Sequence, residues 1–314
     1  MLFLQLISQD MRFRLEKQLP SAQGMAIYDD NLFQLYHTGY CAVHNLKEKD
    51  SKPNAFFPLG SVNEGYPNKD YTNHANQCMF STIRCNDNAL PLMYVTTGNG
   101  IGYDDEGFFY RCCVENILLE RNINGKVVSG RSELLQTISY RDEGIDNSIW
   151  ESPCWGCPAW FVDSKNERLY MLSCRYRTTI EYADRIGNNA YIITSFPLPD
   201  PFSTKKVIYT ASDILDQFIC PFDTLFTQGG MYYNGKIYYT FGLGNDNNFC
   251  YPDRLKVFDL NKRICERTID LSQSILGIEE IECCAFYNGE LYVNTNADSV
   301  GVYSLGSLGN LFEE

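Results

Sequence analysis

The chain has 314 residues and a formal net charge of −13, and 44% of its residues are hydrophobic and 14% aromatic. This composition indicates a globular protein with a large core and excludes an intrinsically disordered chain. An acidic surface repels phosphate groups, so the charge disfavours nucleic acid and membrane surfaces as partners. No apolar run approaches the ~18 residues of a membrane-spanning helix, and the start of the chain lacks the basic region and cleavage site of a signal peptide.

The 13 cysteines are odd in number and include two adjacent pairs, Cys112–Cys113 and Cys283–Cys284. A secreted protein of this size more often has few cysteines or an even, paired set. We therefore expect free thiols and a cytoplasmic location.

The first predicted strand, residues 12–19 (RFRLEKQL), has no partner next to it in the sequence. Segment 23–34 then reads QGMAIYDDNLFQ, which predicts an alternating strand, a tight turn and a second strand. Segment 74–81, HANQCMFS, opens a less regular copy of this phrase, with a register uncertain by one or two residues. A third copy, CPAWFVDSKNERLYML at 157–172, has a longer turn.

Two further copies read QGGMYYNGKIYY at 228–239 and ECCAFYNGELYV at 282–293. Asn-Gly favours the primed turns that join two antiparallel strands. Counting onward from the copies that start at 157 and 228 gives four strand-like segments each, and the copy at 157 is expected to end with strand 205–210. Only three strands follow residue 282. Segments 98–107, 141–157 and 212–223 are predicted to be long loops, the last with a short helix.

Four-stranded repeats of ~40–50 residues are typical of β-propellers. The sequence therefore predicts an all-β fold, a single-domain five-bladed β-propeller over residues 1–314 with blades starting near residues 23, 74, 157, 228 and 282. Strand 12–19 is expected to complete the last blade, because an open ring would expose a sheet edge. A pair of β-sandwiches is the alternative, but it does not account for the spare N-terminal strand.

In a propeller the first strand of each blade lines the central channel, and the residue that opens the strand lies near one mouth. The residues predicted to form this inner-strand ring are Gln23, His74, Cys157, Gln228 and Glu282. Polar groups in a narrow channel need partners from the protein, water, an ion or a ligand. The ring is therefore either a structural hydrogen-bond network or a site for a ligand or for catalysis.

His74 and Glu282 are the candidate catalytic residues. Histidine acts as acid, base or metal ligand near neutral pH, although a lone histidine is commonly structural. Glu282 is the only carboxylate of the ring and can bind a cation or act as a base, with Asn76 in support. The CWGC sequence at 154–157 lacks a second cysteine pair at zinc-site spacing. We expect no cofactor and no dedicated metal site, although the channel offers a place for a divalent cation.

The phrases around Gln23, His74, Gln228 and Glu282 resemble the five-bladed propellers of the teichoic acid biosynthesis protein C-like family, and more loosely the five-bladed glycan-active propellers. The resemblance covers most of the chain and implies the propeller fold. The glycan-active propellers imply a trio of carboxylates on the inner strands. Gln23, Cys157 and Gln228 stand in those places here, which counts against glycoside hydrolysis, since that reaction needs two carboxyl groups.

Three functions remain open. The leading one is non-catalytic binding of a small polar ligand, such as a saccharide, at the channel mouth by Gln23, His74, Asn76, Gln228 and Glu282. The second is a glycan-active hydrolase or lyase at the same site, which requires a second carboxylate near Glu282, and the sequence candidates for it are Asp163, Asp223 and Asp298. The third is a scaffold that binds a protein partner on one face of the disc.

Overall fold

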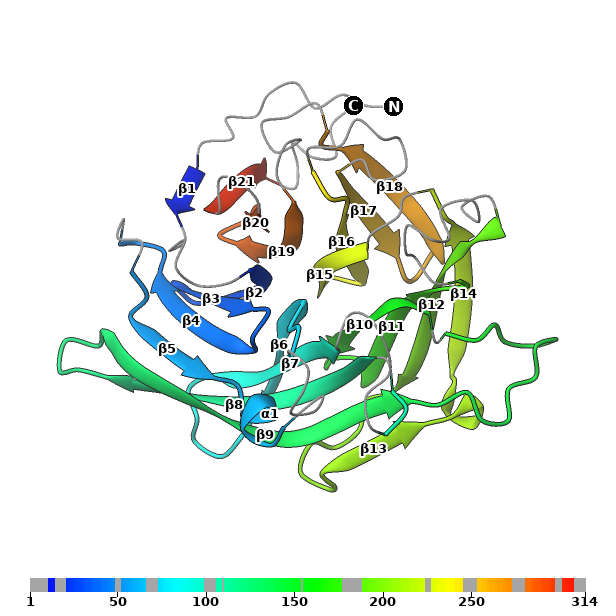
Figure 1. The fold of residues 1–314 in the computed structure, drawn as a ribbon, viewed down its shortest axis with the longest axis horizontal. Helices are drawn as coiled ribbons and strands as arrows, with labels where there is room; N and C mark the ends of the chain where they lie inside the picture. Colours follow the sequence, from blue (N-terminus) through cyan, green and yellow to red (C-terminus); the bar gives the residue numbers. More distant parts are fainter. Residues whose placement is uncertain are drawn as a thin grey trace.

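Five sheets, antiparallel except for one added strand, surround a central axis as blades (Figure 1). The chain is therefore a five-bladed β-propeller, as the sequence predicts. The structure is a computed structural model, which describes residues 11–14, 21–48, 52–65, 73–98, 106–108, 110–153, 155–176, 188–223, 227–244, 253–272, 280–296 and 301–307, with backbone alone at 11–14 and 155–157.

The blades follow one another in chain order, and each starts with the strand nearest the axis. The first blade contains β2 (Ala22–Tyr28), β3 (Asn31–Tyr36), β4 (Tyr40–Asn45) and β5 (Ala55–Pro58). The second contains β6 (Gln77–Arg84), β7 (Pro91–Gly98), β8 (Tyr110–Arg121) and β9 (Val127–Tyr140). The third contains β10 (Trp155–Asp163), β11 (Arg168–Cys174), β12 (Ala190–Pro197) and β14 (Asp216–Pro221). The fourth contains β15 (Thr227–Tyr233), β16 (Lys236–Phe241), β17 (Arg254–Asp259) and β18 (Ile264–Asp270).

The fifth blade is completed by a strand from the start of the chain. It contains β19 (Ile281–Tyr287), β20 (Glu290–Thr295), β21 (Gly301–Ser307) and β1 (Met11–Arg14). Strand β1 pairs antiparallel with β21, with Phe13 opposite Val302 and Arg14 opposite Gly301. This confirms the predicted closure, although residues 15–19 of the predicted strand lie outside the described part.

The prediction for the end of the third blade is wrong. Strand β13 (Lys206–Tyr209) does not join that blade but pairs in parallel with β9 of the second blade. The third blade ends instead with β14, in a segment predicted to be a loop, after the short 3-10 helix η2 (Ala211–Asp213). Strand-forming residues do not specify which sheet a strand joins. The outer edge of the 14-residue strand β9 offers unpaired backbone groups, and β13 satisfies part of them.

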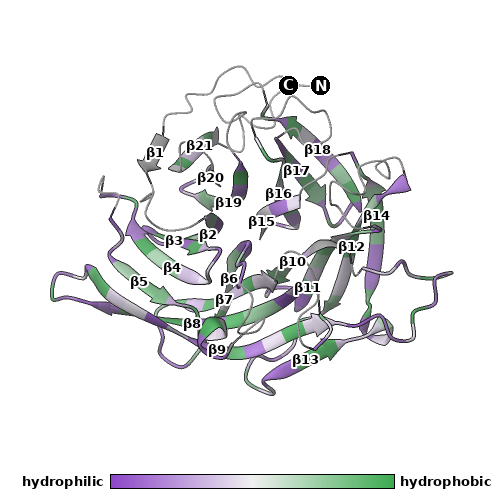
Figure 2. Ribbon diagram, in the orientation of Figure 1, coloured by the Kyte–Doolittle hydropathy of each residue, from purple (hydrophilic) through white to green (hydrophobic). Residues whose placement is uncertain are grey.

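The inner hairpins have the turn geometry that their sequences predict. Asn234 and Gly235 have φ angles of 49° and 79°, and Asn288 and Gly289 have φ angles of 51° and 81°. Two successive positive φ values match the right-handed twist of the flanking strands. Hydrophobic stretches then run through the strands of every blade (Figure 2), and the buried cores lie between neighbouring sheets.

The inner strands meet backbone to backbone at the axis. The amide of Gly24 on β2 donates to the carbonyl of Ala75 at 2.9 Å. A Cβ atom at Gly229 on β15 would lie 2.5 Å from the carbonyl oxygen of Asn76 and 2.7 Å from that of Glu282. At this level the axis is filled by protein, so any ligand site of the channel lies at the mouth above it.

A short helix, α1 (Gly60–Asn63), connects the first two blades and is held by a buried carboxylate. The Glu115 carboxylate accepts hydrogen bonds from the amides of Gly60 and Ser61, both at 2.9 Å, and from the Ser132 hydroxyl at 2.6 Å. Burial raises the pKa of Glu115, while these hydrogen bonds act to lower it. No helix among the described residues is both long and apolar enough to cross a membrane.

The buried cysteines behave as small apolar side chains. Cys112, Cys113, Cys283 and Cys284 are free thiols, as the sequence predicts. Burial raises the pKa of Cys283 to about 12, and likewise that of Cys113. A thiol that resists ionisation is a poor nucleophile, so these cysteines contribute packing and no reactivity.

Candidate functional site

Three inner strands bring polar side chains to one mouth of the channel. Gln23, Gln228 and Glu282 each occupy the second position of their strands, β2, β15 and β19. The Gln23 amide donates to Oε1 of Glu282 at 2.9 Å, which joins the first and last blades. The Gln228 amide donates instead to the carboxylate of Glu280, which is not among the residues predicted from the sequence.

Glu280 and Glu282 form a carboxyl pair. Gln228 Nε2 donates to Oε1 of Glu280 at 3.2 Å, and Asn296 Nδ2 donates to Oε2 at 3.4 Å. A hydrogen bond from Asn296 also acts on the carboxyl of Glu282. One amide therefore reaches both members of the pair, and three amide side chains surround it.

Burial dominates the electrostatics of the carboxyl pair. Glu282 is 1% exposed, and this burial, followed by the charge of Glu280, raises the pKa of Glu282 well above its usual value. Burial also raises the pKa of Glu280. Two adjacent carboxyls in a poorly solvated place resist double ionisation, so the pair favours holding a proton.

His74 lies apart from the carboxyl pair. Its ring packs against that of His37 with a centroid distance of 4.6 Å, and its backbone amide donates to the His37 carbonyl at 2.8 Å. Burial, and then the charge of His37, lowers the pKa of His74 to about 4. The imidazole is therefore neutral near pH 7, which suits a structural role better than proton transfer.

Asn76 takes the place in the inner-strand ring that the sequence gave to His74. The chain turns at His74, which has a φ angle of 45°, so that Ala75 and Asn76 contact Gly24 and Gly229. Asn76 is 3% exposed, and its Oδ1 atom has no hydrogen-bond partner within the described residues. The residue that joins the ring from the second blade therefore lies C-terminal to the predicted one.

The other sequence candidates do not join the carboxyl pair. The Asp163 carboxylate, at the far end of β10, accepts from the Tyr232 hydroxyl at 2.6 Å. The Asp223 carboxylate forms ion pairs with Lys256 at 2.7 Å and Arg254 at 3.1 Å. Asp298 lies outside the described residues, as does the side chain of Cys157, whose backbone belongs to β10.

Glu280 could have been found from the sequence. It stands two residues before Glu282 in the sequence EIE. Glu280 directly precedes β19, and Glu282 is the second residue of that strand. Alternate residues of an extended chain point to the same side, so both carboxylates face the same space. The repeated phrases align one residue per blade, so the column that contains Glu282 leaves Glu280 out.

We expect Glu282→Gln to raise stability by about 1–3 kcal/mol at pH 8 and to have little effect at pH 5. Since the folded-state pKa of Glu282 lies above the unfolded value, its favourable contribution is present at low pH and is lost as pH rises. Glutamine carries no ionisable group and so avoids this loss, and its amide oxygen can still accept the hydrogen bond from Gln23. Urea unfolding from pH 5 to pH 8 measures the difference, and a variant less stable than wild type at pH 8 would contradict it.

Among the described residues, no group of three or more His, Cys, Asp or Glu side chains is arranged to hold a metal ion. A cavity of about 190 Å³ lies away from the carboxyl pair, between the second and third blades. Its walls include Phe108, Tyr140 and Trp160 and none of the inner-strand ring. The mouth of the channel and this cavity are therefore separate candidate sites.

Comparison with solved structures supports the fold. The chain is similar to a glutaminyl cyclase from Myxococcus xanthus, with a TM-score of 0.50 and 11% identity over 96% of this chain and 94% of that chain. A PQQ-bound aldose sugar dehydrogenase from Streptomyces coelicolor has a TM-score of 0.45 and 10% identity over 95% of this chain and 97% of that chain. Neither a family model nor a curated protein matches the sequence. The resemblance to the teichoic acid biosynthesis protein C-like family stays a prediction, and the similarity shows the propeller fold alone.

Proposed function

We propose that the propeller binds a small, hydroxyl-rich ligand such as a saccharide at the channel mouth, through the carboxyl pair. The observation that carries this proposal is the buried Glu282 beside a second carboxyl. Burial raises the pKa of both groups, and no Lys or Arg acts on either within the described residues. Such an arrangement costs folding free energy, and sites that bind ligands commonly retain groups of this kind.

The side chains at the mouth suit hydroxyl groups. The amides of Gln23, Gln228 and Asn296 each offer donors and an acceptor, and a carboxyl that holds a proton donates as well as accepts. Asn76 also lies near the axis, but its Oδ1 atom is buried, so it supports the site from below and does not contact a ligand in this arrangement. A divalent cation is the competing occupant, because carboxylate and amide oxygens are also its preferred ligands.

Binding is favoured over hydrolysis by the placement of the carboxyls. Glu280 supplies the second carboxyl near Glu282 that a glycan hydrolase would need. Both residues, however, come from alternate positions of one chain segment and stand side by side. The carboxyls of glycosidases flank the scissile bond from opposite sides. A glycan-active enzyme is therefore the second candidate.

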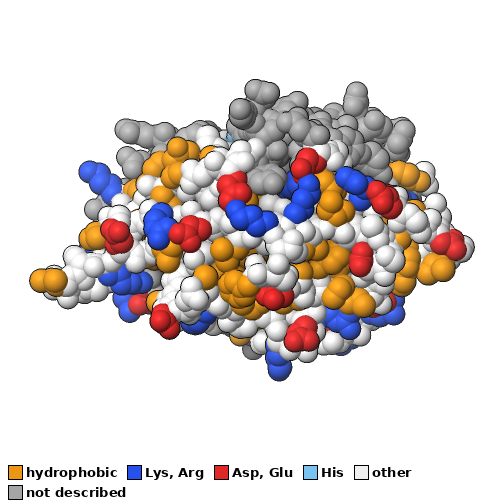
Figure 3. Space-filling view, turned by 90° about the horizontal axis from the view of Figure 1, so that it is seen from below, with side chains coloured by type: hydrophobic (Ala, Val, Ile, Leu, Met, Phe, Trp, Pro, Cys, Tyr) orange, Lys and Arg blue, Asp and Glu red, His pale blue; other side chains and the backbone are white. Residues whose placement is uncertain are grey.

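A protein-binding scaffold is a weaker candidate. Figure 3 shows the edge of the disc, and not its two faces; on this edge acidic and basic side chains are interspersed with apolar groups. A protein partner would favour a continuous apolar patch.

The free buried thiols agree with the cytoplasmic location that we propose, where such thiols stay reduced.

The test is a binding screen by thermal shift and calorimetry. The ligands are neutral mono- and oligosaccharides, with Ca²⁺ and Mn²⁺ in separate arms. Glu280→Gln and Glu282→Gln are compared with Glu120→Gln, which removes an exposed carboxylate on β8. A ligand that binds the folded state raises Tm by mass action, and we expect the two site variants to lose at least ~tenfold in affinity.

The screen distinguishes a saccharide site, a cation site and the absence of a ligand site at the channel mouth. A saccharide that binds wild type and Glu120→Gln but not the site variants supports the proposal, and a product assay on it separates binding from turnover. A response to cations alone would replace the saccharide with a metal ion. No response from any ligand, or equal responses from all variants, would overturn the proposal.

A further inference from the structure

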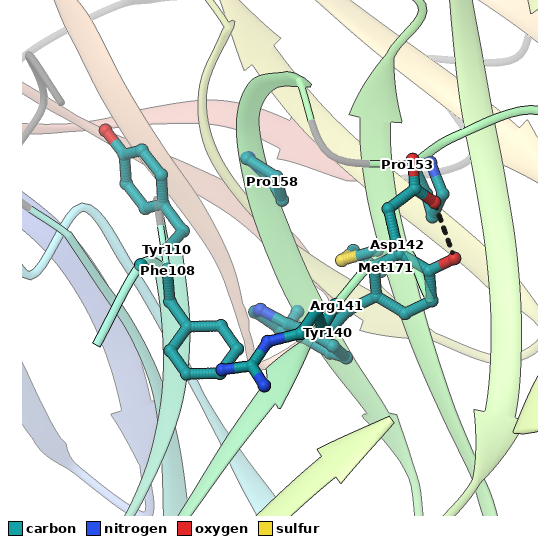
Figure 4. A pocket seen from close by; sticks show the side chains of 10 residues that line it. Phe108, Tyr110, Tyr140, Arg141, Asp142, Pro153, Pro158 and Met171 are labelled. Atoms are coloured by element: carbon teal, nitrogen blue, oxygen red, sulfur yellow. Dashed lines mark hydrogen bonds between the residues drawn. The ribbon is translucent and has the colours of Figure 1, made fainter. Parts of the chain in front are cut away.

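The third blade meets its two neighbours in different ways. Between the second and third blades lies the cavity of about 190 Å³, with Phe108 and Tyr110 on one side and Tyr140 on the other (Figure 4). Between the third and fourth blades, aromatic side chains pack directly across the interface. Two cysteines from different blades lie at this second interface, Cys220 on β14 and Cys265 on β18.

Strand pairing turns both cysteines toward the same interblade space. Cys220 stands opposite Tyr191 in the pairing of β14 with β12, and Cys265 stands opposite Phe258 in the pairing of β18 with β17. Residues directly opposite each other on antiparallel strands share one face of the sheet. The rings of Tyr191 and Phe258 meet across the interface with a centroid distance of 5.7 Å. Each cysteine therefore faces the other blade, next to a contact that joins the two sheets.

Polar contacts on both sides of Cys220 tie this part of the third blade to the fourth. Before it, Nη2 of Arg263 donates to the Gln217 carbonyl at 2.7 Å. After it, the Asp223 carboxylate forms an ion pair with Lys256 at 2.7 Å. The segment that carries Cys220 is thus attached to the fourth blade at both ends, which keeps the thiol beside β18.

The two cysteines contact each other. A backbone hydrogen bond from Cys265 acts on the thiol of Cys220. A disulfide needs Cβ atoms about 4 Å apart, and a thiol that already bonds the backbone of the second cysteine is within that range. Rotation of the two side chains about their Cα–Cβ bonds then suffices to bring the sulfur atoms together.

Partial exposure distinguishes this pair from the other neighbouring thiols. Cys265 is partly exposed, and Cys220 lies behind it with 2% of its surface exposed. Cys78 and Cys283 also interact with each other, but each is at most 1% exposed. A dissolved oxidant therefore reaches Cys265 first and does not reach the pair on the inner strands.

We propose that Cys220 and Cys265 form a disulfide, which links the third and fourth blades, when the protein meets a peroxide or a small-molecule disulfide. With hydrogen peroxide, the Cys265 sulfur attacks one oxygen, the O–O bond breaks, and a sulfenic acid and water result. The Cys220 sulfur then displaces the hydroxyl group from the Cys265 sulfur as a second water. The two thiols lose two electrons, the peroxide gains them, and the thiol protons leave in the two waters.

The surroundings make this reaction slow at neutral pH. Burial raises the pKa of Cys220 to about 11, and it also raises the pKa of Cys265. The thiolate is the attacking form, so only a small fraction of either thiol reacts at any moment. The pair therefore stays reduced in a reducing cytoplasm and responds to sustained oxidation. Cytosolic disulfides commonly serve as such redox sensors.

Peptide mapping of the oxidised protein tests the proposal. The folded full chain is incubated with hydrogen peroxide or with oxidised glutathione, the remaining thiols are blocked, and the chain is digested without reductant. We expect a pair of peptides linked through Cys220 and Cys265, which dithiothreitol separates. Cys85→Ser is the control, because Cys85 is likewise partly exposed but directly follows β6 in the second blade. It should leave the yield of linked peptide unchanged.

Two variants separate the roles of the two thiols. Cys265→Ser changes a partly exposed side chain and should abolish the linked peptide. Cys220→Ala keeps the accessible thiol but removes the one that resolves it. With oxidised glutathione it should therefore accumulate a mixed disulfide at Cys265, at least about tenfold above wild type. Should Cys220→Ala not fold, Cys265→Ser and the mapping of wild type still decide.

The link should also stabilise the fold. Because a disulfide restricts the unfolded chain, oxidised wild type should melt about 3 °C or more above oxidised Cys265→Ser, and dithiothreitol should remove the difference.

Three results would overturn the proposal: no linked peptide after oxidation of the folded protein, linkage of either cysteine to a different one, or a Tm of oxidised wild type no higher than that of oxidised Cys265→Ser. Glu282→Gln should form the link like wild type. The link and the ligand site at the channel mouth therefore succeed or fail independently.

Discussion

Gly229→Ala is expected to destabilise the protein by about 4 kcal/mol or more, and to lower Tm by on the order of 10 °C. The new methyl group would lie 2.5 Å from the Asn76 carbonyl oxygen, 2.7 Å from the Glu282 carbonyl oxygen and 3.1 Å from the Cys283 sulfur. Two of these atoms are backbone, so relief requires moving whole strands of two other blades. Urea unfolding of wild type and variant measures the difference.

Gly289→Ala is the matched control. Gly289 lies in the turn between β19 and β20, with a φ angle of 81° and no atom within 4 Å of an added Cβ. Its substitution costs only the strain of a left-handed residue, about 1 kcal/mol. A loss for Gly229→Ala no larger than that for Gly289→Ala would show that the close contacts at the axis relax at little cost, and would contradict the prediction.

Glu115→Gln is expected to cost about 3–5 kcal/mol. The Glu115 carboxylate accepts two backbone amides of α1 and the Ser132 hydroxyl, and all three donors point at its two oxygens. Glutamine replaces one oxygen with an NH₂ group, which sets donor against donor in a buried place. The helix that joins the first two blades would lose its anchor.

Glu133→Gln is the control for this change. Glu133 neighbours Ser132 on β9 but is exposed and pairs with Arg131. A surface pair contributes little, so we expect a loss below about 0.5 kcal/mol. Hydrogen exchange should show faster exchange of the Gly60 and Ser61 amides in Glu115→Gln alone. Unchanged exchange there would refute the anchoring role.

The inner hairpins made the fold predictable. Asn-Gly pairs predict hairpin turns, and alternation of apolar and polar residues predicts strands. The strand at 12–19 has no neighbouring partner, which predicts that it closes the ring. The partner of β13 was not predictable, because its sequence fits the edge of the second blade as well as that of the third. Choosing between these edges depends on the length of β9 and the path of the preceding loop, which only the folded chain reveals.

The candidate site was predictable in part. Repetition placed Gln23, Gln228 and Glu282 in register, and the structure brings Gln23 against Glu282. His74 was misplaced because a left-handed residue shifts the register without any sequence signal as strong as glycine.

The pairing of β1 with β21 has a consequence for synthesis of the protein. Strand β1 is synthesised long before β21 and remains unpaired until β21 has left the ribosome, since β21 is its partner. Contacts between such distant segments form slowly. Between its own synthesis and its pairing with β1, β21 presents an open edge to chaperones or to a neighbouring nascent chain. Deletion of β1 and deletion of β21, two segments far apart in the chain, should therefore produce the same defect, an incomplete fifth blade.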